Sequence, residues 1–218
     1  MYTLYCLDGT RATAAQMTLA EAGLSFERKT VDITAGAHRT AEFLAINPRG
    51  TIPALTDKNG TLVCETIAIM LYLADRHGLD ELAPMSNDPQ RAMLLDWLVY
   101  HAVEVQEPVK RSYYPHRYAV RADDVGAVRR NANQVFTQRW RLVEAHLRDN
   151  GPYHLGLRFG LADIYLLVTS TYSRDLASGE FTAIERCVQC TAERPQVAPI
   201  LDDHLAGLAH IGEIGVPQ

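Results

Sequence analysis

The chain has 218 residues, of which 47% are hydrophobic and 22% charged, a balance typical of a globular protein of one or two domains. Acidic residues outnumber basic ones, 26 against 21, for a net charge of -5, which argues against nucleic acid and anionic membranes as partners. Because the sequence has no run of about 20 apolar residues to span a membrane and no signal-peptide pattern, we expect a cytoplasmic protein.

Strand and helix patterns alternate over the first 80 residues. Gly23 and Gly78 stand where helices should stop, and Asn59-Gly60 is typical of a hairpin turn. The predicted strands are residues 3–7, 26–33, 52–56 and 61–64, and the predicted helices are 11–22, 41–46 and 66–76. This order, β-α-β-α-β-β-α, indicates a small α/β domain whose last two strands are antiparallel.

The rest of the chain has helical periodicity and no strand pattern. Helices are predicted over residues 91–109, 125–148 and 161–173. We therefore predict a first domain over residues 1–79, a polar linker over 80–89 and an all-helical domain over 90–218.

Cysteine usage favours a reduced protein without a metal site. The four cysteines are too few for a disulfide scaffold. Cys187 and Cys190 form a single C-x-x-C, and no histidine pair stands at zinc spacing. We interpret the pair as two thiols one turn apart on a helix, with a redox pair as the alternative.

The segment Asn47-Pro48-Arg49-Gly50-Thr51-Ile52-Pro53-Ala54-Leu55 places a proline, which cannot donate to a sheet ladder, in a predicted strand. Together with Glu65-Thr66-Ile67-Ala68-Ile69 and Tyr72-Leu73, this segment resembles the glutathione transferase superfamily, in particular its cytosolic, bacterial-type members with delta-, theta- or beta-like sites. The resemblance implies a thioredoxin-like domain followed by an all-α domain, with glutathione as co-substrate and no metal.

In this family the equivalent proline follows a cis bond, so the resemblance implies a cis Ile52-Pro53 bond. The Ile52 backbone would then pair with the cysteine of glutathione as an added strand. The alternative is a trans proline that opens an edge strand. Glu65 and Thr66 would bind the γ-glutamyl amine and carboxylate at a helix N-terminus; alternatively, Glu65 only complements the helix dipole.

The glycine carboxylate of glutathione needs a separate partner. Ala35-Gly36-Ala37-His38 resembles the A-G-x-H of delta and theta members, which implies that His38 contacts this carboxylate, assisted by Arg49 or Arg39. The alternative is a solvated loop histidine.

The thiol needs a group that stabilises its anion. Alignment to the family places Thr10 at the serine of the delta class, Arg11 at the cysteine of the beta class and Tyr5 at the tyrosine of the alpha, mu and pi classes. Thr10 is the first choice, with a helix N-cap as its alternative role. Arg11 would lower the thiol pKa through its charge. Tyr5 has strand packing as the alternative.

The electrophile should bind against the helical domain. The predicted pocket residues are polar or aromatic: Tyr100, Gln106, Tyr113, Tyr114 and His116. The alternative for the aromatic stretch is packing at a helix end. In addition, Gly160-Leu161-Ala162-Asp163 resembles the family's S/T-x-x-D capping box, with Asp163 expected to accept from the Gly160 amide.

The resemblance implies a homodimeric glutathione transferase that activates the glutathione thiol for attack on a small hydrophobic or aromatic electrophile, with no nucleic acid or membrane partner. Two alternatives remain. One is a glutathione-dependent disulfide reductase or peroxidase on the same fold, and the other is a non-catalytic binding or scaffold protein.

Overall fold

A computed structural model describes residues 1–173 and 181–214. The chain divides into two compact units, one formed by Met1–Asp80 with Ala192–Gln218 and the other by Glu81–Thr191. We call these unit 1 and unit 2 and describe each by itself. The domain boundaries given above stay a prediction.

Unit 1 is built on a four-stranded sheet in the order β2-β1-β3-β4. β1 pairs in parallel with β2 and antiparallel with β3, which pairs antiparallel with β4, as expected for the last hairpin. The elements in chain order are β1 (Tyr2–Cys6), α1 (Ala12–Glu21), β2 (Phe26–Thr30), η1 (Ala37–Arg39), α2 (Ala41–Ile46), β3 (Ala54–Thr56), β4 (Leu62–Cys64), α3 (Thr66–His77) and α9 (Ala198–Ile214).

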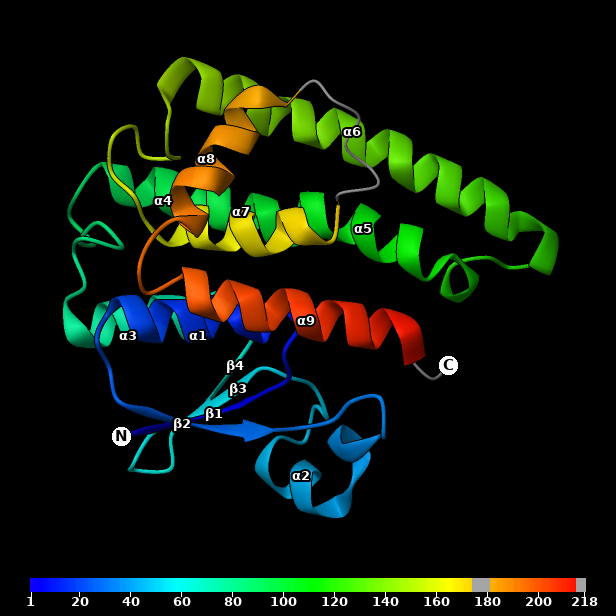
Figure 1. The fold of residues 1–218 in the computed structure, drawn as a ribbon, viewed down its shortest axis with the longest axis horizontal. Helices are drawn as coiled ribbons and strands as arrows, with labels where there is room; N and C mark the ends of the chain where they lie inside the picture. The colour runs from blue at the N-terminus through cyan, green and yellow to red at the C-terminus, as the bar shows by residue number, and fades with distance from the viewer. Residues whose placement is uncertain (174–180, 215–218) are drawn as a thin grey trace. The chain divides into compact units, whose positions relative to one another are not determined.

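The two faces of this sheet carry different helices. Tyr2, Leu4 and Cys6 alternate into a buried core with side chains of α1 and α3, as a strand period of two requires. Tyr5 points to the opposite face, where its ring meets Phe43 of α2 edge-on at 6.0 Å. α1 and α3 therefore lie on one face of the sheet and α2 on the other (Figure 1).

The third strand is shorter than predicted. It begins at Ala54 rather than at residue 52, so the prediction that Pro53 lies inside a strand was wrong. The physical reason is that proline has no amide hydrogen and cannot take part in the ladder. The Ile52–Pro53 peptide bond is cis, as the resemblance implied.

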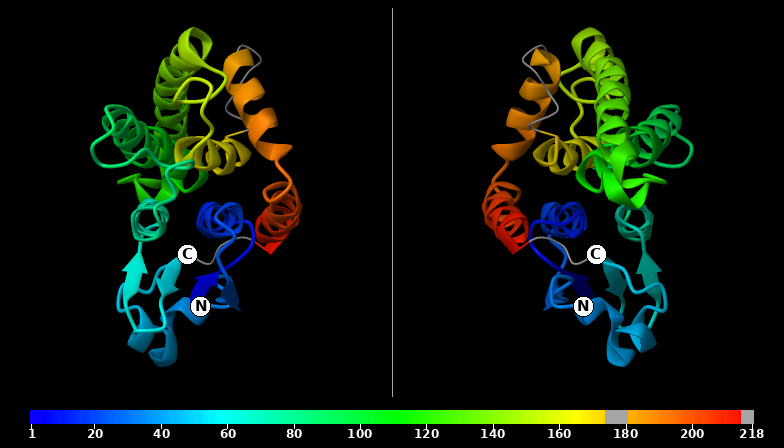
Figure 2. Two further views of the ribbon diagram at one scale, coloured as in Figure 1. Left: turned by 90° about the vertical axis from the view of Figure 1, so that its left-hand side faces the viewer. Right: turned by 90° about the vertical axis from the view of Figure 1, so that its right-hand side faces the viewer.

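The helix α9 belongs to unit 1, although we expected residues 90–218 to form one helical part. It runs beside α1 in the views of Figures 1 and 2. The Thr13 hydroxyl of α1 hydrogen-bonds to the His204 Nδ1 of α9 at 2.8 Å, and both side chains are buried. Arg194 makes two hydrogen bonds, at 3.1 and 2.7 Å, to the nearly buried Glu21 carboxylate. α9 therefore covers α1.

The described residues of unit 2 form helices joined by loops, and they contain no strand apart from isolated bridges in residues 153–158. Its helices are α4 (Gln90–Tyr100), the π-helical turn η2 (His101–Val105), α5 (Gln106–Tyr113), η3 (Pro115–Arg117), η4 (Ala122–Asp124), α6 (Val125–Asn150), α7 (Leu161–Thr171) and α8 (Thr182–Ala192). Its core includes Phe136 and Trp140 of α6 with Leu166 of α7. Across residues 1–173 and 181–214, no helix combines the length and apolar character that crossing a membrane requires.

The N-terminus of α7 is capped by Asp163. Its Oδ2 accepts from the Gly160 amide at 2.8 Å, which confirms the predicted capping contact. A Cβ at Gly160 would lie 2.7 Å from the Leu82 carbonyl oxygen. Glycine therefore stands where the family has Ser or Thr because the neighbouring backbone leaves no room for a side chain.

Candidate functional site

The sheet gathers the predicted glutathione-binding residues at one edge. Tyr5 pairs with Ala54, and Ala54 pairs with Cys64. Because these pairings are antiparallel, the loop that follows β1, the segment that leads into β3 and the start of α3 come to the same edge. Thr10, Ile52 and Glu65 lie on these three segments.

The buried Asn47 shapes the turn that leads to Ile52. Its side-chain Nδ2 donates to the Thr51 carbonyl oxygen at 2.7 Å, and its Oδ1 accepts from the Arg49 amide at 3.1 Å. Its own carbonyl oxygen accepts from the Gly50 amide at 2.9 Å. Asn47 is a positioning residue to which our sequence reasoning assigned no role, although the motif contains it.

The Ile52 backbone precedes the paired part of the sheet. The register of β3 with its neighbours starts at Ala54, so Ile52 stays outside the ladder. An extended peptide can pair with backbone groups in such a position.

Glu65 and Thr66 begin α3. Glu65 has φ 71° and ψ 125°, a conformation that non-glycine residues rarely adopt. Its carboxylate lies 3.4 Å from the Arg49 guanidinium, and both side chains are exposed. The first hydrogen bond of α3 joins the Ile69 amide to the Glu65 carbonyl oxygen, so the amides of residues 66–68 have no partner within the helix. This helix start can hold an anion beside a carboxylate.

His38 and Arg39 reach the same edge from η1. A Cβ built on Gly50 would lie 2.8 Å from the Arg39 Nη1 and 3.1 Å from the His38 carbonyl oxygen, so η1 lies against the 47–51 turn. Burial, with the charge of Arg39 adding to it, lowers the pKa of His38. Within the described residues its buried Nδ1 has no hydrogen-bond partner. The lowered pKa favours a neutral His38 imidazole on η1, whose backbone lies against the 47–51 turn.

The loop between β1 and α1 carries Thr10 and Arg11. The Thr10 hydroxyl donates to the Leu7 carbonyl oxygen at 2.6 Å and accepts from the Ala12 amide at 3.4 Å, the contact of a helix cap. Arg11 precedes α1 and is partly exposed, and its guanidinium forms no ion pair or hydrogen bond within residues 1–173 and 181–214. In the described residues, the Thr10 hydroxyl therefore already has hydrogen-bond partners, whereas the Arg11 guanidinium has none.

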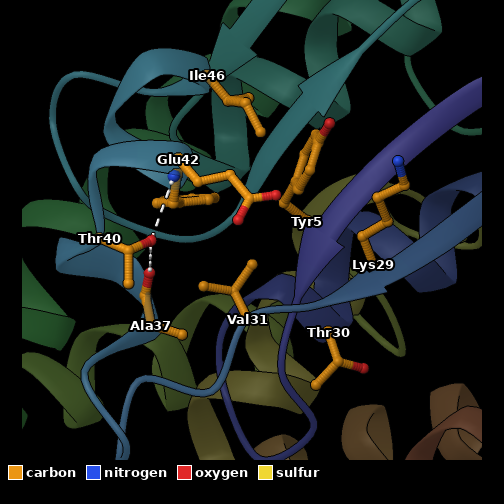
Figure 3. A pocket seen from close by; sticks show the side chains of 9 residues that line it. Tyr5, Lys29, Thr30, Val31, Ala37, Thr40, Glu42 and Ile46 are labelled. Atoms are coloured by element: carbon orange, nitrogen blue, oxygen red, sulfur yellow. Dashed lines mark hydrogen bonds between the residues drawn. The ribbon is translucent and has the colours of Figure 1, made fainter.

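Tyr5 lies away from this loop, on the face of the sheet that α2 covers. Its ring lines a cavity of about 240 Å³ with the Glu42 and Val31 side chains, and the Lys29 ammonium is 6.0 Å from its centroid (Figure 3). The packing alternative that we gave for Tyr5 describes these contacts.

Unit 2 holds the predicted electrophile-binding residues in two groups. Tyr100 donates to the Arg139 carbonyl oxygen at 3.1 Å, and the buried Gln106 accepts from the Tyr165 hydroxyl at 2.7 Å. Both side chains therefore have hydrogen-bond partners inside unit 2. The other three, Tyr113, Tyr114 and His116, lie at the end of α5 and in η3.

These last residues form an aromatic and cationic cluster. Tyr113 is 49% exposed. The Arg117 guanidinium lies 4.4 Å from the Tyr114 ring centroid, and the His116 ring meets Tyr114 edge-on at 6.3 Å. Flat or anionic molecules can stack on such a surface.

Unit 2 contains a buried polar cluster that we did not predict from the sequence. Its members are His101, His154, Asp163 and Cys187. The Nε2 atoms of His101 and His154 lie 2.9 Å apart, and His154 Nδ1 lies 2.7 Å from Asp163 Oδ1. The Cys187 thiol donates to the same oxygen at 3.4 Å. Burial, with the charges of His154 and His146 adding to it, lowers the pKa of His101 well below its ordinary value.

Three of these groups are close enough to share a cation. Ligand atoms of His154, Asp163 and Cys187 lie within 4.8 Å of one another. However, the Asp163 carboxylate already accepts from the amides of His154 and Gly160, and burial strongly raises the pKa of the Cys187 thiol. We therefore assign the cluster to capping α7. Cys187 and Cys190 are free thiols on α8, as predicted.

Comparison with known proteins identifies relatives over most of the chain. Residues 11–76 match the family model of the glutathione S-transferase N-terminal domain. Glutathione S-transferase GstA of Escherichia coli O157:H7 is 31% identical over 91% of this chain and 96% of its own length. Glutathione S-transferase 3 of Zea mays is 33% identical, over 82% of this chain and 77% of its own. A glutathione transferase homolog from Sulfitobacter, solved with bound glutathione, superposes with a TM-score of 0.83 at 27% identity, over 94% of this chain and 99% of its own.

Proposed function

Because the chain belongs to the glutathione transferase family, we propose that it binds glutathione at the sheet edge of unit 1 and activates the thiol for attack on a small hydrophobic or aromatic electrophile. The observation that carries this proposal is the strained Glu65 at the start of α3, at the edge reached by Ile52 and the Thr10 loop. Strained residues persist where the surrounding structure enforces a functional geometry.

Each part of glutathione would meet one segment of this edge. The Glu65 carboxylate would pair with the γ-glutamyl amine, and the Thr66 hydroxyl and the start of α3 would hold the adjacent carboxylate. The Ile52 backbone, ahead of Pro53, would pair with the cysteine backbone. His38 and Arg49 would hold the glycine carboxylate.

The thiol would lie at the loop between β1 and α1. A free cysteine thiol has a pKa of about 8.5, so a transferase must stabilise the thiolate. The Thr10 hydroxyl would have to exchange its bond to Leu7 to donate to sulfur. Since the Arg11 guanidinium has no partner in the described residues, we assign it the larger share of the pKa shift and Thr10 the smaller. Tyr5 takes no part in this assignment.

The test is a pH titration of the thiolate absorbance of bound glutathione. We expect the thiol of glutathione bound to the wild type to have a pKa at least about two units below that of free glutathione. In Arg11→Ala this pKa should rise by more than half of that difference. Thr10→Val is the matched control, since it keeps the shape and removes the hydroxyl.

Each outcome has a distinct meaning. If Thr10→Val abolishes the shift and Arg11→Ala does not, our assignment is wrong. Binding without any shift in the wild type would contradict the transferase proposal and favour reduction of disulfides or peroxides by bound glutathione. No binding would favour a scaffold protein.

The acceptor and the assembly are part of the same proposal. Tyr113, Tyr114 and His116 would contact a flat electrophile, and an electrophile screen with their alanine variants tests this. A homodimer is expected from the family and is checked by light scattering. A cytoplasmic location is checked by cell fractionation.

A further inference from the structure

We propose that Gly207 of α9 is a positioning residue for the loop that meets the glutathione thiol. The inference rests on the proposed function and deepens it. It assigns a role in thiol activation to a residue almost 200 positions away from Thr10 and Arg11, on a helix that our sequence reasoning placed in the other part of the chain.

The contact is one of backbone against backbone. A Cβ at Gly207 would lie 2.5 Å from the Asp8 carbonyl carbon, and 2.7 Å from both the Asp8 oxygen and its Cβ. A Cβ at Gly9 would lie 2.4 Å from the Leu208 amide nitrogen and 2.5 Å from the Gly207 carbonyl carbon. Two glycines therefore face each other where the loop crosses α9, and no side chain fits between them.

The position of α9 along α1 is fixed by side chains. The buried bond between Thr13 and His204 lies one helical turn from the crossing, because His204 and Gly207 are three residues apart on α9. The Arg194–Glu21 pair holds the far end of α1. Because these two contacts fix α9, Gly207 cannot move away from the loop unless they break.

The loop is also held from the sheet. Asp8 forms an ion pair with Arg28 of β2. The loop is therefore confined between β2 and α9, and a group added on the α9 side must move Asp8 and the residues that follow it. Those residues are Gly9, Thr10 and Arg11, which we assign to the thiol.

Gly207→Ala is the decisive variant. Alanine ordinarily stabilises a helix relative to glycine, so helix propensity does not explain a loss of thiol activation in this variant. We expect the pKa of the bound thiol to rise by about one unit, which is a tenfold change in its ionisation constant. The Kd of glutathione should stay within about threefold, because Ile52, Glu65 and Thr66 are untouched.

Gly126→Ala is the matched control on α6. There the added Cβ would meet only the end of the Arg130 side chain, at 3.3 Å, so we expect no change in thiol pKa. Amide chemical shifts of residues 8–11 in substrate-free protein provide a second readout, which we expect to move in Gly207→Ala and not in Gly126→Ala.

The outcomes separate the two proposals. Unmoved loop shifts in Gly207→Ala would overturn the positioning role whatever the catalytic result. A lowered thiol pKa in the wild type that persists in Gly207→Ala would also overturn it and leave the transferase proposal standing. If the loop shifts move but the wild type shows no lowered thiol pKa, α9 positions the loop. The transferase proposal and the role of Gly207 in thiol activation would then both be overturned.

A second variant keeps the test decisive if Gly207→Ala does not fold. Thr13→Val removes the hydroxyl that bonds to His204 without adding volume. It should loosen α9 from α1, shift the same loop amides and raise the thiol pKa in the same direction. Wild-type values for both readouts would overturn the proposal.

Discussion

Replacing Glu65 by glycine should stabilise the protein while weakening glutathione binding. Glu65 has a positive φ of 71°, which costs a non-glycine residue about 1–3 kcal/mol. Glycine avoids this strain but loses about 0.5–1 kcal/mol through the greater freedom of the unfolded chain. The ion pair with Arg49 is 3.4 Å long between exposed side chains, so its loss costs at most about 0.5 kcal/mol.

The net expectation for Glu65→Gly is a gain of about 1 kcal/mol in the free energy of unfolding, or about 2–4 °C in Tm at this chain length. In the same variant, losing a charge-assisted contact worth about 1.5–3 kcal/mol should raise the Kd of glutathione at least about tenfold. Urea unfolding followed by far-ultraviolet circular dichroism measures the first quantity, and titration calorimetry measures the second.

Glu65→Gln is the control, because it keeps the side-chain length and the backbone strain and removes only the charge. Its stability should match the wild type within about 0.5 kcal/mol, and its affinity should fall as in Glu65→Gly. A Glu65→Gly protein less stable than Glu65→Gln would refute the strain argument. Wild-type affinity in both variants would refute the role of the carboxylate.

Three further variants test other parts of the structure. Asn47→Asp removes the donor to Thr51 inside a buried turn and should cost about 2–3 kcal/mol in unfolding free energy with a measurable rise in the Kd of glutathione; an unchanged Kd in calorimetry would contradict the positioning role. The free energy of unfolding should fall as pH drops below about 6.5, because the unfolded chain takes up a proton that the buried His101 ring resists. The expected slope from His101 is up to about 1.4 kcal/mol per pH unit. In urea titrations between pH 7.5 and 5.5, the unfolding free energy of His101→Gln should depend less steeply on pH. Glu144 accepts from the first amides of α8 at 3.0–3.1 Å, so Glu144→Ala should lower the unfolding free energy by about 1–2 kcal/mol, and an unchanged denaturation midpoint would count against this cap.

Local sequence signals predicted the elements whose ends are set by nearby residues. α2 has the predicted bounds because Thr40 caps its start and Pro48 forbids its continuation. α3 ends at Gly78 in a left-handed conformation, as expected. The third strand was predicted too long, because its hydrophobic pattern continues through Pro53 while its hydrogen bonds do not.

Contacts between distant segments could not be predicted from periodicity. The sequence around α9 shows a helix at most, and nothing in its spacing indicates that Gly207 meets Gly9 or that His204 meets Thr13. The buried contacts of His101 with His154 likewise join residues 53 positions apart. Such contacts depend on the three-dimensional path of the chain.

The two unusual backbone positions of unit 1 are tested by opposite chemical changes, the removal of a side chain at Glu65 and the addition of a methyl at Gly207. At Glu65 the side chain is the source of strain, so removing it should raise stability and lower affinity. At Gly207 the missing side chain is what lets the loop approach α9, so adding a methyl should disturb thiol activation even though helix propensity improves. Helix propensity and φ preference alone predict that both substitutions are harmless or stabilising. A loss of binding in the first and of thiol activation in the second, with both proteins folded, would therefore show that the Glu65 side chain and the glycine at position 207 serve function rather than stability.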